Sequence, residues 1–396
     1  MITAAVICEY NPFHNGHLYQ IEYIKKTLKA DRVICLMSGD FTQRGEPAVF
    51  EKSVRTKWAL LSGADLVLCL PVLFSTGSAE IFAYGAVSIL DRLNCVDYLC
   101  FGTETDDLNR LNELMFKIRD NAMIDNPEIQ KLIRSGLTYA QARASVLKDY
   151  EDILSGSNNI LAIEYLLSLR RLNSSVKPYI IKRKGSFYND EDLDAKNTYA
   201  SATAIRKGIK ENKETGSFLP SFVYDDLKDL TPVYPNDLSD ILKYKLTEES
   251  DLSNFYDVSS DLSLRIKNKL SSFESFDSFA ETLKAKNFTR TRINRSLCHI
   301  LLNINKDIDP YDIADNILYI RNLGFKKDSS DLLSLIKERS DINVISKIPD
   351  HENEFNDADR YVFDKDLFSF KIYDDILYRK TGVHAPNEYS KQIVVL

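Results

Sequence analysis

The chain has 396 residues, of which 44% are hydrophobic and 28% are charged, and its formal net charge is -7. This length exceeds one ordinary hydrophobic core and predicts two or three domains, while the composition is typical of a water-soluble globular protein. No apolar run approaches the ~20 residues that span a bilayer. The net charge excludes a uniformly basic nucleic-acid-binding surface, so any RNA contact must be a local patch.

The N-terminal residues and the cysteines indicate the cellular compartment of the protein. The chain enters a predicted strand at once, without a basic segment and a cleavage site, so the sequence predicts a cytoplasmic protein. Its six cysteines form no C-x-x-C pair, and most lie in apolar runs. Buried thiols in a reducing compartment are expected, and no metal site is predicted.

A histidine pair follows the first predicted strand. An apolar run over residues 4–8 predicts a buried strand, a turn-prone cluster over 11–16 predicts a tight loop, and apolar spacing from Leu18 predicts a helix. His14 and His17 lie three residues apart at the start of this helix, so they point to one side. Helix N-termini bind phosphate, and imidazoles can donate hydrogen bonds to it. A nucleotide-binding loop is predicted, with a capped helix carrying surface histidines as the alternative.

Strands and helices alternate along the first half of the chain. Further strands are predicted at 33–37, 66–70, 98–101 and 179–182, and helices at about 17–29, 50–62, 78–92 and 107–147. This order predicts an α/β fold, with a Rossmann-like parallel sheet and helices on both faces. Ligands of such sheets bind outside the carboxyl ends of the strands, so the loops there should carry the chemistry.

The loop and helix after the second strand are rich in polar groups. Gln43 and Arg44 could reach a carboxylate or a phosphate, although an ordinary surface loop explains them equally well. Lys52, Arg55 and Lys57 follow on the next helix. They could extend a basic rim, with a solvated helix face as the default interpretation.

Later loops add candidate nucleotide contacts. Gly102 after the fourth strand lets a base or ribose pack against the backbone, with a plain turn as the alternative. Residues of about 105–150 predict a helical excursion before the fifth strand. A new helix is then expected to be capped by Ser157 or Asn158, and Asn159 could bind an adenine or ribose edge or serve only the cap.

Two basic segments suit a triphosphate. The Lys-Arg-Lys run at 182–184 follows the fifth strand, with a solvated charge run as the alternative. Ser201 and Thr203 open another predicted helix, and Arg206 follows one turn later. Hydroxyl groups at a helix N-terminus with a nearby arginine predict a second phosphate site, or otherwise an N-cap with a surface arginine.

The C-terminal half differs in character. A boundary near 213–222 separates an expected catalytic domain, 1–215, from a mainly helical domain, 216–396. Residues 282–306 contain no Asp or Glu but six Lys and Arg residues with an aromatic among them, which suits RNA. The alternative is a cationic helix face packed against the acidic stretch at 248–261. The candidate RNA-binding residues are Lys284, Lys286, Arg290, Arg292 and Arg295.

Several strings resemble one family. The string Glu9-Tyr10-Asn11-Pro12-Phe13-His14-Asn15-Gly16-His17 is similar to the bacterial tRNA(Met) cytidine acetate ligases of the HxGH nucleotidyltransferase superfamily. Residues 37–47, 101–104, 158–165, 201–206 and 288–295 resemble further segments of this family. The resemblance implies ATP-dependent activation of acetate as acetyl-adenylate, with Mg²⁺ accompanying the triphosphate. It also implies acetylation of N4 of the wobble cytidine of elongator tRNA(Met), bound by the C-terminal region.

The resemblance also implies roles for single residues. His14, His17 and Arg206 would be catalytic. The ATP contacts would be Ile7, Cys8, Glu9, Tyr10, Asn11, Pro12, Phe13, His14, Asn15, Gly16, His17, Leu18, Tyr19, Gln20, Gly102, Asn158, Asn159, Arg183, Lys184, Ser201, Thr203 and Arg206. The chain departs from the family pattern at Ser157, which replaces a proline, and at Asn189, which replaces a histidine, so no acid–base role is expected at 189.

Two other functions are compatible with these patterns. One is a small-molecule adenylyltransferase of the same superfamily, with the C-terminal half serving only in assembly. The other is a non-catalytic RNA-binding protein with a relic nucleotide fold. AMP as the final product would favour the ligase, an adenylated metabolite would favour the transferase, and failure to bind ATP would favour the RNA-binding protein.

Overall fold

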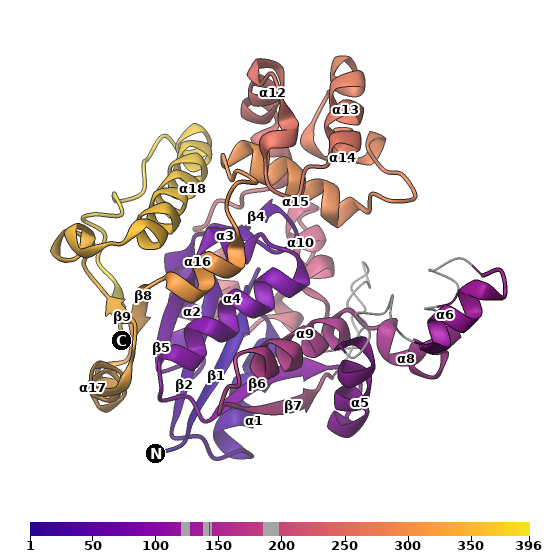
Figure 1. The fold of residues 1–396 in the computed structure, drawn as a ribbon. Helices are drawn as coiled ribbons and strands as arrows, with labels where there is room; N and C mark the ends of the chain where they lie inside the picture. Colours follow the sequence, from indigo (N-terminus) through magenta and orange to yellow (C-terminus); the bar gives the residue numbers. More distant parts are fainter. Residues whose placement is uncertain (120–126, 138–141, 143–144, 185–197) are drawn as a thin grey trace.

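A computed structural model describes residues 1–119, 127–137, 142, 145–184 and 198–396. Within these residues the main sheet has eight strands in the order β10-β8-β5-β2-β1-β6-β7, with β9 paired to β8 (Figure 1). The N-terminal strands are β1 (Thr3–Cys8), β2 (Arg32–Ser38), β5 (Leu66–Leu70), β6 (Tyr98–Thr103) and β7 (Lys177–Lys182).

All five predicted strands are confirmed. Neighbours among them pair in parallel, with Cys8 opposite Met37 and Met37 opposite Cys69. The apolar runs of β1, β2, β5 and β6 are largely buried on both faces, as expected of a parallel sheet covered by helices, whereas the edge strand β7 is mostly half-buried. In consequence, the carboxyl ends of β1, β6 and β7 meet at one edge of the sheet.

Helices cover both faces of this sheet. α4 (Ala79–Arg92), α5 (Leu108–Arg119) and α9 (Ser157–Arg171) pack together on one face, in front of the sheet in Figure 1. Apolar residues of α1 (Asn15–Lys26), α2 (Lys52–Leu61) and α10 (Ala202–Lys210) pack on the other face. Alternate residues of each strand serve the two cores, since successive side chains point to opposite faces. The short elements α3 (Val72–Ser75), α6 (Pro127–Arg134) and α8 (Glu151–Leu154) lie in the connections.

The C-terminal residues return to the sheet, which the sequence did not predict. β8 (Tyr319–Phe325) pairs antiparallel with β5, while β9 (Asn343–Ile345) and β10 (Val394–Val395) pair in parallel with β8. The Arg and Asn residues within β8 obscure the apolar pattern of a buried strand. The boundary near residue 215 stays a prediction, but the sheet draws strands from both sides of it.

The C-terminal half is otherwise mainly helical, as predicted. Its helices are α11 (Ser221–Leu227), α12 (Ser239–Glu248), α13 (Ser260–Lys269), α14 (Phe276–Thr282), α15 (Arg290–Leu301), α16 (Pro310–Asn316), α17 (Ser330–Arg339) and α18 (Asp357–Thr381). Helices α12 to α15 gather at the top of Figure 1. In the described part of the chain, no helix combines the length and the apolar character needed to cross a membrane. The six cysteines are buried and unpaired, as expected.

Candidate active site

A cavity opens at the carboxyl ends of β1, β6 and β7, between the starts of α1, α9 and α10. Most of the predicted ATP-binding residues line it, although they come from five separate segments. These are Ile7, Cys8, Glu9, Tyr10, Asn11, His14, Gly16, His17, Tyr19, Gln20, Gly102, Asn158, Arg183, Lys184, Thr203 and Arg206. Pro12, Phe13, Asn15, Leu18, Asn159 and Ser201 are not part of the lining.

The two histidines form the start of α1. His14 is the N-cap, and its Nδ1 accepts a hydrogen bond from the Gly16 N–H at 3.0 Å, while Nδ1 of His17 accepts from the His14 N–H at 3.3 Å. The rings stack with centroids 3.7 Å apart. Because each Nδ1 is an acceptor, the hydrogen-bond network assigns the ring proton to Nε2. Each neutral ring therefore keeps an Nε2–H donor.

Burial and nearby cations keep these rings neutral. Burial lowers the pKa of His14 to about 3, helped by the charges of Arg183 and Arg206. Burial also lowers the pKa of His17 well below its ordinary value, with His14 and Arg183 adding to the effect. Two neutral donors beside two permanent cations suit the oxygens of a polyphosphate.

Arg183 directly follows β7, and Arg206 lies in α10. An Nη atom of Arg206 donates to the Asn11 carbonyl at 2.8 Å, and the other donates to the Thr203 hydroxyl at 3.2 Å. Ser201 caps α10 by accepting from the Ala204 N–H at 3.0 Å, so its hydroxyl acts in the cap and the next turn faces the cavity. Lys184 lies over the Tyr19 ring. Residues 185–197, including Asn189, lie outside the described residues.

The start of α9 differs from the sequence expectation. Neither Ser157 nor Asn158 caps this helix, because its N-cap is Gly156, which has no side chain to do so. The Glu104 carboxylate, from the end of β6, accepts instead from the N–H groups of Asn158 and Asn159 at 3.3 and 2.9 Å. The buried Asn159 side chain accepts from the Glu104 N–H at 3.0 Å. Asn159 therefore holds β6 against α9 behind the cavity wall, whereas Asn158 lines it.

Two cations of α2, Lys52 and Arg55, are buried near the carboxyl ends of the strands, which corrects the expectation for this helix. Lys52 and Arg55 form neither a basic rim nor a solvated face, because both are buried. Lys52 pairs with Asp40 at 2.6 Å and with Glu388 at 3.2 Å. Arg55 donates to the Glu9 carbonyl at 2.7 Å and to carbonyls at the end of β2. Because some of these partners lie far from α2 in the sequence, the sequence did not indicate the structural role of Lys52 and Arg55.

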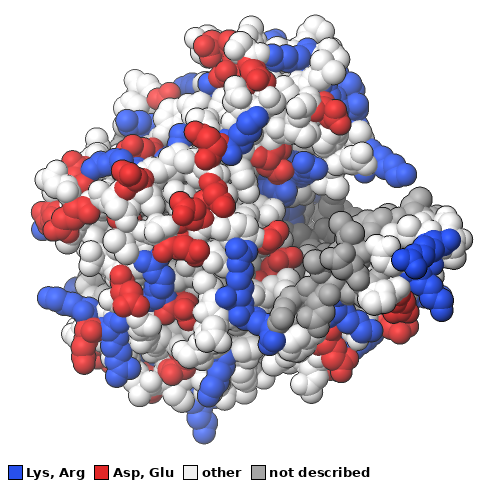
Figure 2. Space-filling view, viewed as in Figure 1, with Lys and Arg blue, Asp and Glu red and all other residues white. Residues whose placement is uncertain are grey.

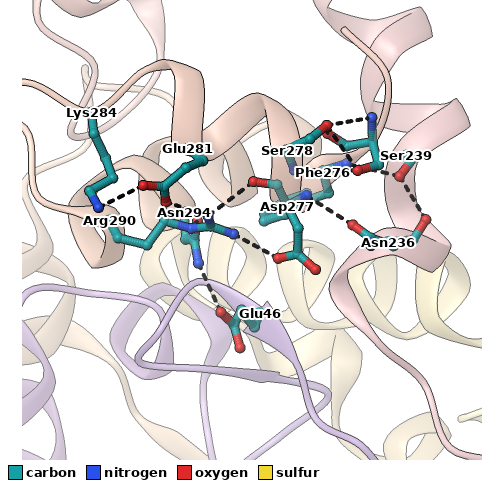
Figure 3. Close-up of polar contacts among 11 residues, drawn as sticks. Glu46, Asn236, Ser239, Phe276, Asp277, Ser278, Glu281, Lys284, Arg290 and Asn294 are labelled. Atoms are coloured by element: carbon teal, nitrogen blue, oxygen red, sulfur yellow. Dashed lines mark hydrogen bonds and ion pairs between the residues drawn. The ribbon is translucent and has the colours of Figure 1, made fainter. Parts of the chain in front are cut away.

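The loop between β2 and α2 reaches both the cavity and the C-terminal helices. Its hairpin strands are β3 (Phe41–Thr42) and β4 (Glu46–Pro47), and Gln43 and Arg44 between them line the cavity. Gly45 has φ +69°, and a Cβ there would lie 2.3 Å from the backbone nitrogen of Arg295 in α15. Asn294 donates to the Glu46 carboxylate at 2.8 Å, as Figure 3 shows. Helix α15 thus rests directly on an active-site loop.

The candidate RNA-binding residues lie on and beside α15. Most are ion-paired: Arg290 with Asp277 and Glu281, Lys284 with Glu281, and Arg292 and Arg295 with Asp257. Figure 3 shows the pairs of Arg290 and Lys284. Lys286 is exposed at the turn before α15. Figure 2 shows both charge signs interspersed over the face in view. Exposed ion pairs such as that of Lys284 are weak and can exchange for phosphate contacts, whereas the Arg295 pair is less accessible, so the RNA role stays a prediction.

The cavity wall also contains residues that the sequence did not single out as contacts, among them Phe82, Phe101, Leu161 and Tyr165. A signal was present on α9, because residues 158, 161 and 165 share one helix face at spacings of three and four. Apolar and aromatic residues at helical spacing usually indicate core packing, so the spacing alone does not predict a cavity wall.

Comparisons with known proteins place the chain in a family. The HIGH Nucleotidyl Transferase family model matches residues 1–388. The tRNA(Met) cytidine acetate ligase of Thermoanaerobacter sp. (strain X514) is 39% identical over 391 residues, 96% of each chain. That of Clostridium perfringens (strain SM101 / Type A) is 40% identical over 365 residues, 88% of this chain and 90% of the other.

Two solved structures are similar to this chain over its full length. The crystal structure of apo Thermotoga maritima TmcAL has a TM-score of 0.88 and 28% identity, with all of both chains covered. Thermotoga maritima TmcAL bound with alpha-thio ATP has a TM-score of 0.86 and 27% identity, again over all of both chains. The chain therefore belongs to the tRNA(Met) cytidine acetate ligase family of HIGH nucleotidyl transferases.

Proposed function

We propose that this protein activates acetate with ATP and transfers the acetyl group to N4 of the wobble cytidine of elongator tRNA(Met). The observation that carries the chemistry is the pair of neutral histidines at the start of α1, beside Arg183 and Arg206. Family membership supports the acyl acceptor, since the relatives are named tRNA(Met) cytidine acetate ligases.

The first step is adenylation of acetate. A carboxylate oxygen of acetate attacks the α-phosphorus of ATP, and the bond between the α-phosphorus and pyrophosphate breaks. The Nε2–H groups of His14 and His17 donate to the oxygens on which charge develops. Each such donor typically contributes ~10²–10³ in rate. Pyrophosphate leaves towards Thr203 and Arg206 at the start of α10, where the helix N-terminus favours anions.

The second step joins the acetyl group to RNA. The cytidine must leave its stack to reach a cavity at the strand ends. The tRNA would bind along α15, whose backbone packs on Gly45 beside the cavity residues Gln43 and Arg44. AMP is then released with acetylated tRNA.

Mg²⁺ is expected to accompany ATP, held by phosphate oxygens. Among residues 1–119, 127–137, 142, 145–184 and 198–396, no group of three or more His, Cys, Asp or Glu side chains could hold a metal ion. We therefore assign no metal ligand, and no step above depends on one.

A His17→Ala substitution tests the assignment. The protein and the variant are incubated with ATP, with and without acetate, and pyrophosphate release is measured. Loss of one donor should slow acetate-dependent release by about 10²–10³. The matched control is His351→Ala, because His351 is not part of the cavity lining and pairs with the exposed Glu354. Near-normal release by the His17 variant would refute the proposed chemistry.

A further inference from the structure

The active-site cavity has a second half with no assigned role. The histidine pair and the phosphate-binding start of α10 lie on the α1 and α10 side of the sheet. On the α4 and α9 side, the cavity is lined by Phe82 of α4, Phe101 of β6, and Leu161 and Tyr165 of α9. We call these four residues the apolar recess. Glu9, just beyond the end of β1, stands between the two halves.

Tyr165 brings a hydroxyl group to the apolar recess. The side chain is 3% exposed, and its hydroxyl forms no hydrogen bond with any residue that the structure describes. Burial raises its pKa well above the ordinary value, with the charges of Cys8 and Glu9 adding to the effect, so the hydroxyl remains a donor. Because Tyr165 lines the cavity, its hydroxyl can donate to a polar group of a ligand in the recess.

Glu9 offers an acceptor at the edge of the same recess. Its Oε1 accepts from the Gln43 N–H at 2.7 Å, which fixes the carboxylate in place. Its Oε2 forms no hydrogen bond with the residues of the described chain, and the residue lines the cavity. A carboxylate with one oxygen anchored and one oxygen open can accept a proton from a bound donor.

These features favour a neutral ring over the anionic groups of the substrates in the proposed reaction. Acetate and the triphosphate are anions, so the charge of Glu9 disfavours both beside it. A cytosine is flat and neutral, and it stacks on aromatic side chains such as Phe101 and Tyr165, whose ring centroids lie 5.3 Å apart. Its N4 amine is a donor, and carboxylates accept from this amine in nucleic-acid recognition.

We propose that the apolar recess holds the target cytosine and that Glu9 accepts the N4 proton during acetyl transfer. The inference rests on the proposed function and gives its second step a base. The N4 nitrogen forms a bond to the acetyl carbonyl carbon, and one N4–H bond breaks as its proton moves to Glu9. The carbonyl carbon–oxygen bond to AMP then breaks, with the electron pair leaving on AMP. Glu9 returns the proton to water.

The test separates activation from transfer. Hydroxylamine is itself a strong nucleophile, so acetohydroxamate formed from ATP, acetate and hydroxylamine measures acetyl-adenylate without needing Glu9. Transfer is measured as N4-acetylcytidine in tRNA(Met). A Glu9→Gln variant keeps an oxygen for the Gln43 N–H but cannot take a proton. We expect its transfer rate to fall at least 100-fold, and at least tenfold more than its hydroxamate yield. Glu22→Gln, on the exposed face of α1, is the matched control.

A second variant tests the recess itself. Tyr165→Phe keeps the ring and removes only the hydroxyl, so we expect the KM for tRNA in transfer to rise while hydroxamate formation changes far less. Tyr244→Phe, at a side chain 71% exposed, is its control. The inference is overturned if Glu9→Gln transfers acetyl within threefold of the unaltered protein, or if both activities fall together in the two cavity variants. Absence of hydroxamate with the unaltered protein would instead refute the proposed function.

Discussion

His14 combines a structural and a chemical role that one substitution can separate. Its Nδ1 caps α1, and its Nε2–H is the donor assigned to the α-phosphate. Asparagine is among the best N-cap residues, so His14→Asn should leave the free energy of unfolding within about 0.5 kcal/mol. The shorter side chain cannot supply the distant donor. We therefore expect acetate-dependent pyrophosphate release to slow by about 10²–10³, equivalent to roughly 2.7–4 kcal/mol of transition-state stabilisation.

The comparison variant is His14→Ala. It loses the cap as well, which should lower the free energy of unfolding by a further ~1 kcal/mol. Urea unfolding gives the stability of both variants, and pyrophosphate release gives their rates. The reasoning is refuted if the asparagine variant keeps more than a tenth of the activity, or if it loses as much stability as the alanine variant.

Three further predictions address the core and the RNA surface. Burial lowers the pKa of His299 in α15 to about 4, so at pH 5 the proton binds the unfolded chain more tightly than the folded one. The destabilisation caused by His299→Gln in urea unfolding should therefore be about 2 kcal/mol smaller at pH 5 than at pH 7. Equal destabilisation at the two pH values would contradict this. Glu388→Ala removes the buried carboxylate that pairs with Arg321 and leaves Lys52 with Asp40, so it should cost about 3–5 kcal/mol in the same assay. Glu22→Ala on the surface should cost under ~0.5 kcal/mol, and similar costs for the two variants would show that burial does not strengthen these ion pairs. Lys286→Glu should raise the KM for tRNA several-fold and leave hydroxamate formation unchanged, and an unaltered KM would remove Lys286 from the RNA surface.

The sequence predicts the parts of the fold that local patterns encode. Runs such as 66–70 are apolar throughout because both faces of β5 are buried, and they identify the parallel strands directly. The antiparallel strand β8 was not predicted. It mixes polar and apolar residues, and it pairs with Leu66–Leu70 from the other end of the chain. Such a pairing has no local signature.

The candidate site likewise contains residues whose position follows from local sequence patterns and residues whose position does not. His14 and His17 lie where the motif places them, since the cap that orients them is formed within four residues. By contrast, the spacing of Asn159 suggests a nucleotide contact, yet its partner is the backbone of a distant strand end. In the sequence Lys52 resembles a solvated lysine, but in the folded chain it pairs with Glu388 of the C-terminal segment. Long-range partners decide these roles, and periodicity cannot supply them.

The central claim is that the cavity makes an acetyl-adenylate whose acyl group passes to RNA. The most direct measurement is mass spectrometry of nucleosides from elongator tRNA(Met) after incubation with the protein, ATP and acetate. We expect N4-acetylcytidine at the wobble position, AMP and pyrophosphate as co-products, and formation of all three slowed by about 10²–10³ with His17→Ala. An adenylated small molecule as the final product, with unmodified tRNA, would contradict it.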